Sequence, residues 1–107
     1  MTAPFVAGID GGQTSTTAVL LDAAGTLLGR GTAGPSDHVD EPPDSERAAA
    51  ACEAALAAAL RAARLPAGTE PAAVTVGLSG YEGAWHGRPP ALRSPLVRVV
   101  HDTVIAL

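Results

Sequence analysis

One short stretch, Asp10-Gly11-Gly12-Gln13-Thr14, has the residue types and spacing to bind a phosphate group. Apolar runs at residues 5–9 and 18–21 flank it, and such runs joined by a glycine pair predict a β-hairpin in which the glycines turn the backbone. Glycines let backbone amides approach a ligand closely, and successive N–H groups in a turn form an anion-binding concavity. An aspartate beside that turn can hold Mg²⁺ against the same phosphates. The alternative is a plain surface turn, which would not require the hydroxyl residues that follow the glycines.

Polar residues also end two later apolar runs. Ser79-Gly80 follows residues 72–78, and Asp102 follows residues 96–101. Ligands of parallel α/β sheets bind at the carboxyl ends of the strands, so these residues and Asp10 are expected to meet at one sheet edge. A phosphate turn, a metal-anchoring aspartate and a second aspartate as general base are the parts that phosphoryl transfer needs. Asp102 could instead cap a helix that starts at residue 103, and the two roles are compatible.

The strands that would position these residues are expected at residues 5–9, 16–22 and 26–32, and then at 72–78 and 96–101. The first three follow one another closely and should pair antiparallel. In the third, glycines suggest a bulge or a weak edge. A long helix separates the third strand from the fourth, and such a crossover makes the later strands parallel to the first. The predicted fold class is therefore α/β, with three antiparallel strands, two parallel strands and a crossover helix.

The expected helix is rich in alanine and runs from an N-cap at Asp44 or Ser45 to about Arg64. Cys52, Leu56 and Leu60 follow one another at spacings of four residues and mark the buried stripe. Cys52 is expected to be a small core residue and not a nucleophile, because no base lies at a useful spacing. The sequence at residues 65–68 contains proline and glycine and should end the helix.

The amino-acid composition excludes several classes of protein function. The chain has 107 residues, enough for one modest core, and 47% of them are hydrophobic. The net charge of −4 argues against a nucleic-acid partner or an anionic membrane. No lysine occurs, which excludes a Walker-type phosphate loop. No signal peptide or membrane-spanning stretch is seen, so a soluble, cytoplasmic protein is expected.

The loop at residues 34–44 is rich in proline, aspartate and serine. Ser36, Asp37 and His38 could contact a substrate, or the loop could be a simple connector, which composition alone favours.

The hairpin sequence from Gly8 to Thr14 resembles the first phosphate motif of the sugar kinase/actin/heat-shock chaperone superfamily. More narrowly, it is similar to the BadF/BadG/BcrA/BcrD-type ATPase family, which includes N-acetylglucosamine and glucosamine kinases. Gly77-Leu78-Ser79-Gly80 resembles the family segment whose serine contacts sugar, and Val100-His101-Asp102 resembles the segment that carries the base. The residues around His38 stand where the sugar kinases have an Asn-His pair, with Asp37 in place of the asparagine.

The resemblance implies an RNase H-like fold and ATP-dependent phosphoryl transfer to N-acetylglucosamine or glucosamine, with ATP and Mg²⁺ as cofactors. It makes Asp10 the metal ligand and Asp102 the catalytic base. The phosphate-binding residues would be Gly11, Gly12, Gln13 and Thr14, together with Asp10. The sugar-binding residues would be Ser36, Asp37, His38, Ser79 and Gly80. Family members continue into a second domain, so residues 1–107 are expected to be the N-terminal subdomain of a longer kinase, inactive alone. A homodimer is left open.

Three other functions compete with the kinase. One is the ATPase that activates 2-hydroxyacyl-CoA dehydratases, which holds an iron–sulfur cluster through cysteines. Another is an RNase H-like nuclease, which would need Glu46 and Asp102 to converge with Asp10. The last is a non-catalytic fragment or binding module.

Overall fold

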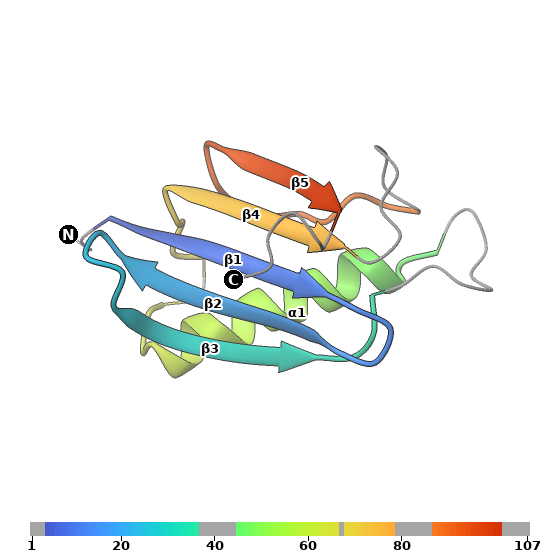
Figure 1. Ribbon diagram of the computed structural model, residues 1–107, viewed down its shortest axis with the longest axis horizontal. Coiled ribbons are helices and arrows are strands. Elements are labelled where there is room, and N and C mark those ends of the chain that lie inside the picture. The colour runs from blue at the N-terminus through green and yellow to red at the C-terminus, as the bar shows by residue number, and fades with distance from the viewer. Residues whose placement is uncertain (1–3, 37–44, 67, 79–86, 102–107) are drawn as a thin grey trace.

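The computed structural model describes residues 4–36, 45–66, 68–78 and 87–101. One helix and five strands form in these ranges (Figure 1). They are β1 (Phe5–Gly11), β2 (Thr16–Asp22), β3 (Leu27–Ala33), α1 (Arg47–Ala62), β4 (Ala73–Leu78) and β5 (Val97–His101). All six lie where the sequence predicts them, to within two residues at the strand ends.

The strands form a single sheet in the order β3-β2-β1-β4-β5. β1 pairs antiparallel with β2 and parallel with β4, and β5 continues the parallel part beside β4. The crossover through α1 explains this mixture, because a strand that returns after a long helix lies parallel to its neighbour. The predicted fold class, an RNase H-like mixed sheet with three antiparallel and two parallel strands, is confirmed.

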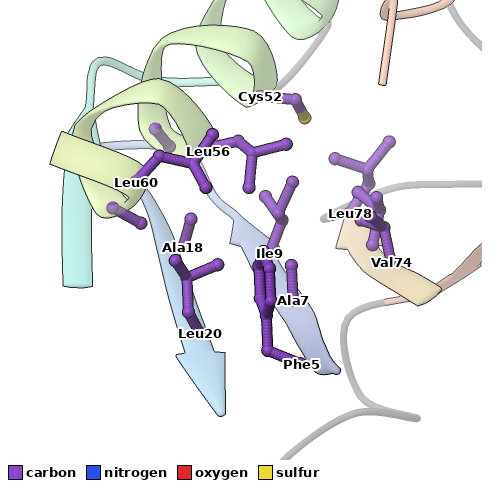
Figure 2. Close-up of a cluster of buried hydrophobic side chains, with 13 residues drawn as sticks. Phe5, Ala7, Ile9, Ala18, Leu20, Cys52, Leu56, Leu60, Val74 and Leu78 are labelled. Atoms are coloured by element: carbon purple, nitrogen blue, oxygen red, sulfur yellow. The ribbon is translucent and has the colours of Figure 1, made fainter. Parts of the chain in front are cut away.

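The core lies between α1 and one face of the sheet (Figure 2). Alternate residues of β1, from Phe5 through Ala7 to Ile9, point into it, and Cys52, Leu56 and Leu60 meet them from the helix. The predicted helical stripe is therefore confirmed. Burial of this apolar surface stabilises the fold at roughly 25 cal/mol per Å².

The two glycines of β3 let α1 approach the sheet. A β-carbon at Gly29 would lie 2.5 Å from the carbonyl oxygen of Ala59, and one at Gly31 would meet the Ala59 nitrogen. The sequence predicted that these glycines mark a bulge or a weak edge, and β3 is an edge strand with a bulge beside Gly29. Leu20 pairs with Gly29 and Leu21 with Leu27, so Leu28 is left over. The close contact of these glycines with α1 was not predicted.

The helix ends differ from the predicted pattern. Its N-cap is Glu46, with no side-chain cap bond, and the Ser45 hydroxyl accepts the Arg47 N–H at 3.1 Å. At the other end Arg64, and not a glycine, takes the left-handed conformation with φ 59°. Its N–H bonds to Arg61 and that of Leu65 bonds to Leu60, which is the Schellman arrangement.

Candidate functional site

The predicted phosphate-binding residues, Asp10 to Thr14, lie at the edge of the sheet where β1, β3, β4 and β5 end, in and beside the β1–β2 connection (Figure 1). This convergence follows from the topology: β2 is the one strand that runs the other way. The connection between β3 and α1 also starts at this edge. Residues from separate parts of the chain can therefore reach a ligand placed there.

The β1–β2 connection is a turn of four residues, 12–15, closed by a hydrogen bond of 2.9 Å from the Gly12 N–H to the Ser15 carbonyl. The hairpin forms as predicted, but the predicted role of its glycines in turning the backbone is not observed. Neither Gly11 nor Gly12 has a positive φ, so the glycines are not needed for backbone conformation. They matter because they carry no side chain. Gln13, Thr14 and Ser15 are exposed, so a ligand can approach the turn from solvent.

Asp10 is exposed on the sheet face opposite α1, because it alternates with the buried Ile9 and Gly11. Thr17 lies beside it on β2 and Gly77 on β4. Gly77 has no side chain, so β4 presents only backbone next to the aspartate. An exposed carboxylate beside an open turn is an arrangement that can hold a divalent cation against an anionic ligand.

Ser36 lies on the other face of the hairpin. Its side chain is 4% exposed, and a β-carbon at Gly11 would meet the Ser36 hydroxyl oxygen. Its N–H donates to the Gly12 carbonyl at 3.0 Å. The hydroxyl has no hydrogen-bond partner among the described residues. The structure thus brings Ser36 against the predicted phosphate turn, on the side away from Asp10.

The remaining predicted site residues lie outside the described residues. They are Asp37, His38, Ser79, Gly80 and Asp102. The structure nevertheless fixes where two of these segments begin, because Leu78 ends β4 beside Gly11, and His101 ends β5 beside Leu78.

A second polar cluster, missed by the sequence analysis, joins the N-terminal half of α1 to the segment at residues 87–91. Arg88 donates to both carboxylate oxygens of Glu53, at 2.7 and 3.3 Å, and to Glu46 at 3.0 Å. The Ala91 N–H adds a bond of 2.7 Å to Glu53. Hydrogen bonding from Arg88, with a further contribution from Ala91, lowers the pKa of Glu53. No local signal predicts this cluster, because Glu53 and Arg88 are 35 positions apart.

Glu46 is committed to that cluster, so it does not converge with Asp10 as a two-metal nuclease would require. No group of three or more His, Cys, Asp or Glu residues that could hold a metal ion occurs in the described part of the chain. Cys52 is fully buried, and desolvation raises its pKa to about 12. It is a core residue, as predicted, and its thiol is not available as a ligand. Within the described ranges no helix is long and apolar enough to cross a membrane.

The sequence matches no protein-family model and no curated protein. Among solved structures it is similar to a protein provisionally named N-acetylglucosamine kinase from Chromobacterium violaceum, with 26% identity and a TM-score of 0.71 over 94% of this chain. It is also similar to a diol dehydratase-reactivating factor in its nucleotide-free form, with 26% identity and a TM-score of 0.53 over 69% of this chain. The chain spans 35% of the first structure and 12% of the second. Its fold is that of the sugar kinase/actin-like superfamily.

Proposed function

We propose that this chain is the phosphate-binding part of an ATP-dependent sugar kinase, with N-acetylglucosamine or glucosamine as the acceptor. One observation carries the proposal: an exposed Asp10 stands beside an open four-residue turn at the edge where the parallel strands end. The similarity to the kinase from Chromobacterium violaceum over 94% of this chain supports it. Within the superfamily we place the chain with the BadF/BadG/BcrA/BcrD-type ATPases, on the residues of its hairpin motif.

The residues present fit Mg²⁺ and the phosphates of ATP. Mg²⁺ is commonly held by one or two carboxylates together with substrate phosphates, so a single exposed Asp10 is sufficient. Bound there, the ion would neutralise charge on the phosphate oxygens. Gln13 and Thr14 would supply backbone N–H groups, and Gly11 and Gly12, which carry no side chain, would leave room for the phosphates to approach them.

The sugar would be bound from two sides of the same edge. Ser36 has a buried hydroxyl with no partner among the described residues, and such a group calls for a partner such as a ligand hydroxyl. We assign Asp37, His38, Ser79 and Gly80 to the sugar, and Asp102 to the general base, from their match to the kinase motifs. The base would accept the proton of the attacking sugar hydroxyl, a contribution of typically 10²–10⁴-fold.

A second candidate is an ATPase that serves another enzyme, a function suggested by the structural similarity to the diol dehydratase-reactivating factor. The kinase is favoured because it matches more of this chain, 94% against 69%, and matches it more closely. The buried Cys52 also counts against the iron–sulfur type of dehydratase activator, since its raised pKa disfavours the thiolate that a cluster needs.

We further propose that residues 1–107 act as the N-terminal subdomain of a longer, cytoplasmic kinase. A second domain would close over the turn and exclude water from the phosphates. Without that wall, the 107-residue chain is expected to bind ATP with a dissociation constant of about 1 mM and not to phosphorylate sugar.

The test is an NMR titration of the ¹⁵N-labelled chain with ATP, once with Mg²⁺ and once with a chelator. We expect the amides of the turn to shift, and binding to be tighter with Mg²⁺ because Asp10 repels the uncomplexed phosphates. Asp10→Asn should remove this dependence on Mg²⁺. Glu70→Gln, which removes an exposed carboxylate before β4, should retain it.

Two outcomes would count against the proposal. If the turn amides do not shift at about 10 mM ATP, the chain does not bind nucleotide in the expected range. If Asp10→Asn keeps the full Mg²⁺ dependence, the ion is held elsewhere.

A further inference from the structure

Thr16 ties the start of β2 to the segment that follows β3. Its side chain is fully buried, and its hydroxyl donates to the Gly34 carbonyl at 2.8 Å. Thr16 pairs with Gly11 in the β1–β2 ladder, so the bond is made directly at the base of the turn. The Gly34 carbonyl lies beyond Ala33, the last paired residue of β3, so no N–H of the β2–β3 ladder donates to it. The threonine hydroxyl therefore fixes a connection that the ladder leaves free.

Ser36 holds the first residue of the turn. Gly12 is bonded at both of its polar groups: its N–H reaches the Ser15 carbonyl at 2.9 Å, and its carbonyl accepts the Ser36 N–H at 3.0 Å. The contact is close because Gly11 has no β-carbon, which would otherwise collide with the Ser36 hydroxyl and come within 2.7 Å of Leu78. The requirement for glycine at position 11 is thus explained by Ser36 and not by backbone conformation.

The bond to the Gly12 carbonyl has a directional consequence. A trans peptide is planar, with its C=O and N–H pointing in opposite directions, and no cis peptide is found in the described chain. Because the Gly12 carbonyl points to Ser36, the Gln13 N–H of the same peptide points away from it. Ser36 packs on the α1 side of Gly11, whereas Asp10 lies on the opposite face. The Gln13 N–H is therefore aimed toward the side of the turn that carries Asp10.

We propose that Thr16, Gly34 and the backbone of Ser36 form a brace that aims the Gln13 N–H and so sets the phosphate affinity of the turn, without touching the phosphate. Thr16 is a positioning residue. Its hydroxyl donates to the Gly34 carbonyl and so fixes residues 34–36, whose Ser36 N–H binds the Gly12 carbonyl. That bond sets the orientation of the peptide that carries the Gln13 N–H. This inference rests on the proposed phosphate-binding role of the turn. It adds Thr16 and Gly34, which act from the buried face and are not among the predicted site residues.

The test compares the wild-type chain with Thr16→Val, which keeps the shape and removes the hydroxyl, and Thr16→Ser, which keeps the hydroxyl. Each is titrated with ATP and Mg²⁺ and followed at the amides of residues 11–14 by NMR. One net hydrogen bond corresponds to a factor of up to about ten in affinity, so we expect Thr16→Val to bind about five- to tenfold more weakly. Thr16→Ser should bind like the wild type. Equal affinity of the valine variant, or equal weakening in both variants, would overturn the brace.

Amide hydrogen exchange separates this inference from the proposed function. In the wild type, Gly12 and Ser36 should exchange slowly and Gln13 fast, because only Gln13 points its N–H outward. Fast exchange at Ser36 would overturn the brace even if Thr16→Val does not fold. If the wild type shows the expected exchange but no shift with ATP, the nucleotide function fails. The brace is then tested by amide exchange alone: Thr16→Val should speed exchange at Gly12 and Ser36 relative to Val19, a reference residue in the same sheet. Unchanged exchange rates at Gly12 and Ser36 would overturn the brace.

Discussion

Gly31 lies directly against the backbone of Ala59, so that β3 and α1 touch without an intervening side chain. A β-carbon at position 31 would meet the Ala59 nitrogen and would come within 2.5 Å of the Ala55 carbonyl oxygen. Backbone atoms in the middle of a helix cannot move aside individually. The separation between helix and sheet is therefore set at this point by the absence of a methyl group.

Gly31→Ala should accordingly destabilise the fold, by about 1–3 kcal/mol, the usual cost of overpacking a core. Thermal unfolding followed by circular dichroism measures it, with a fall in Tm of roughly 4–8 °C for each kcal/mol. Gly34→Ala is the matched control, since nothing lies within 4 Å of a β-carbon there and its φ is not positive. A Gly31→Ala variant as stable as the control would show that the helix can shift outward at little cost.

A substitution at Arg64 should instead stabilise the fold. It holds the left-handed conformation that ends α1, and this costs a side-chain-bearing residue about 1 kcal/mol relative to glycine. Arg64→Gly should therefore stabilise the chain by about that amount, visible as a higher Tm. Arg61→Gly, the same substitution within the last helical turn, should lower it because glycine weakens a helix interior. If both variants lowered Tm, the side chain of Arg64 would matter more than its backbone.

The hydrogen-bonded carboxylate of Glu53 should make the free energy of unfolding depend on pH in the acid range. The hydrogen bond from Arg88 holds its pKa below the ordinary value of 4.5. The carboxylate therefore contributes stability above that value, and the contribution is lost as pH falls through the lowered pKa. We expect Glu53→Gln to be less stable than the wild type at pH 7 and to approach it as the pH falls below 4.5 and through the lowered pKa. Measuring the Tm of both proteins across this range checks the prediction, and a difference in Tm that stays constant with pH would contradict it.

The elements were predictable because their signals are local. β1 and β2 show apolar alternation on either side of a glycine pair, and α1 shows Cys52, Leu56 and Leu60 on one stripe. Parallel pairing of β4 with β1 followed from one crossover rule. The position of Asp10 at the sheet edge then required no further information.

The contacts between distant segments were not predictable. The hydrogen bond from Thr16 to Gly34 spans 18 positions, and that from Arg88 to Glu53 spans 35. Neither leaves a periodic or compositional trace, because any arginine near any glutamate would look the same in sequence. The role of the glycines in β3 was missed for a related reason: it depends on which face meets the helix, and that is settled only when α1 docks.

Along β1, consecutive residues serve separate purposes: Ile9 is fully buried in the core, whereas the next residue, Asp10, faces outward beside the turn. A substitution at Asp10 therefore leaves the core packing untouched, whereas a substitution at Ile9 would disturb it. The strand thus allows the outward face to be varied independently of foldability. Libraries randomised at Asp10 and Thr17, on the outward face, should yield mostly folded proteins, in which the proposed anion binding can be selected for or against.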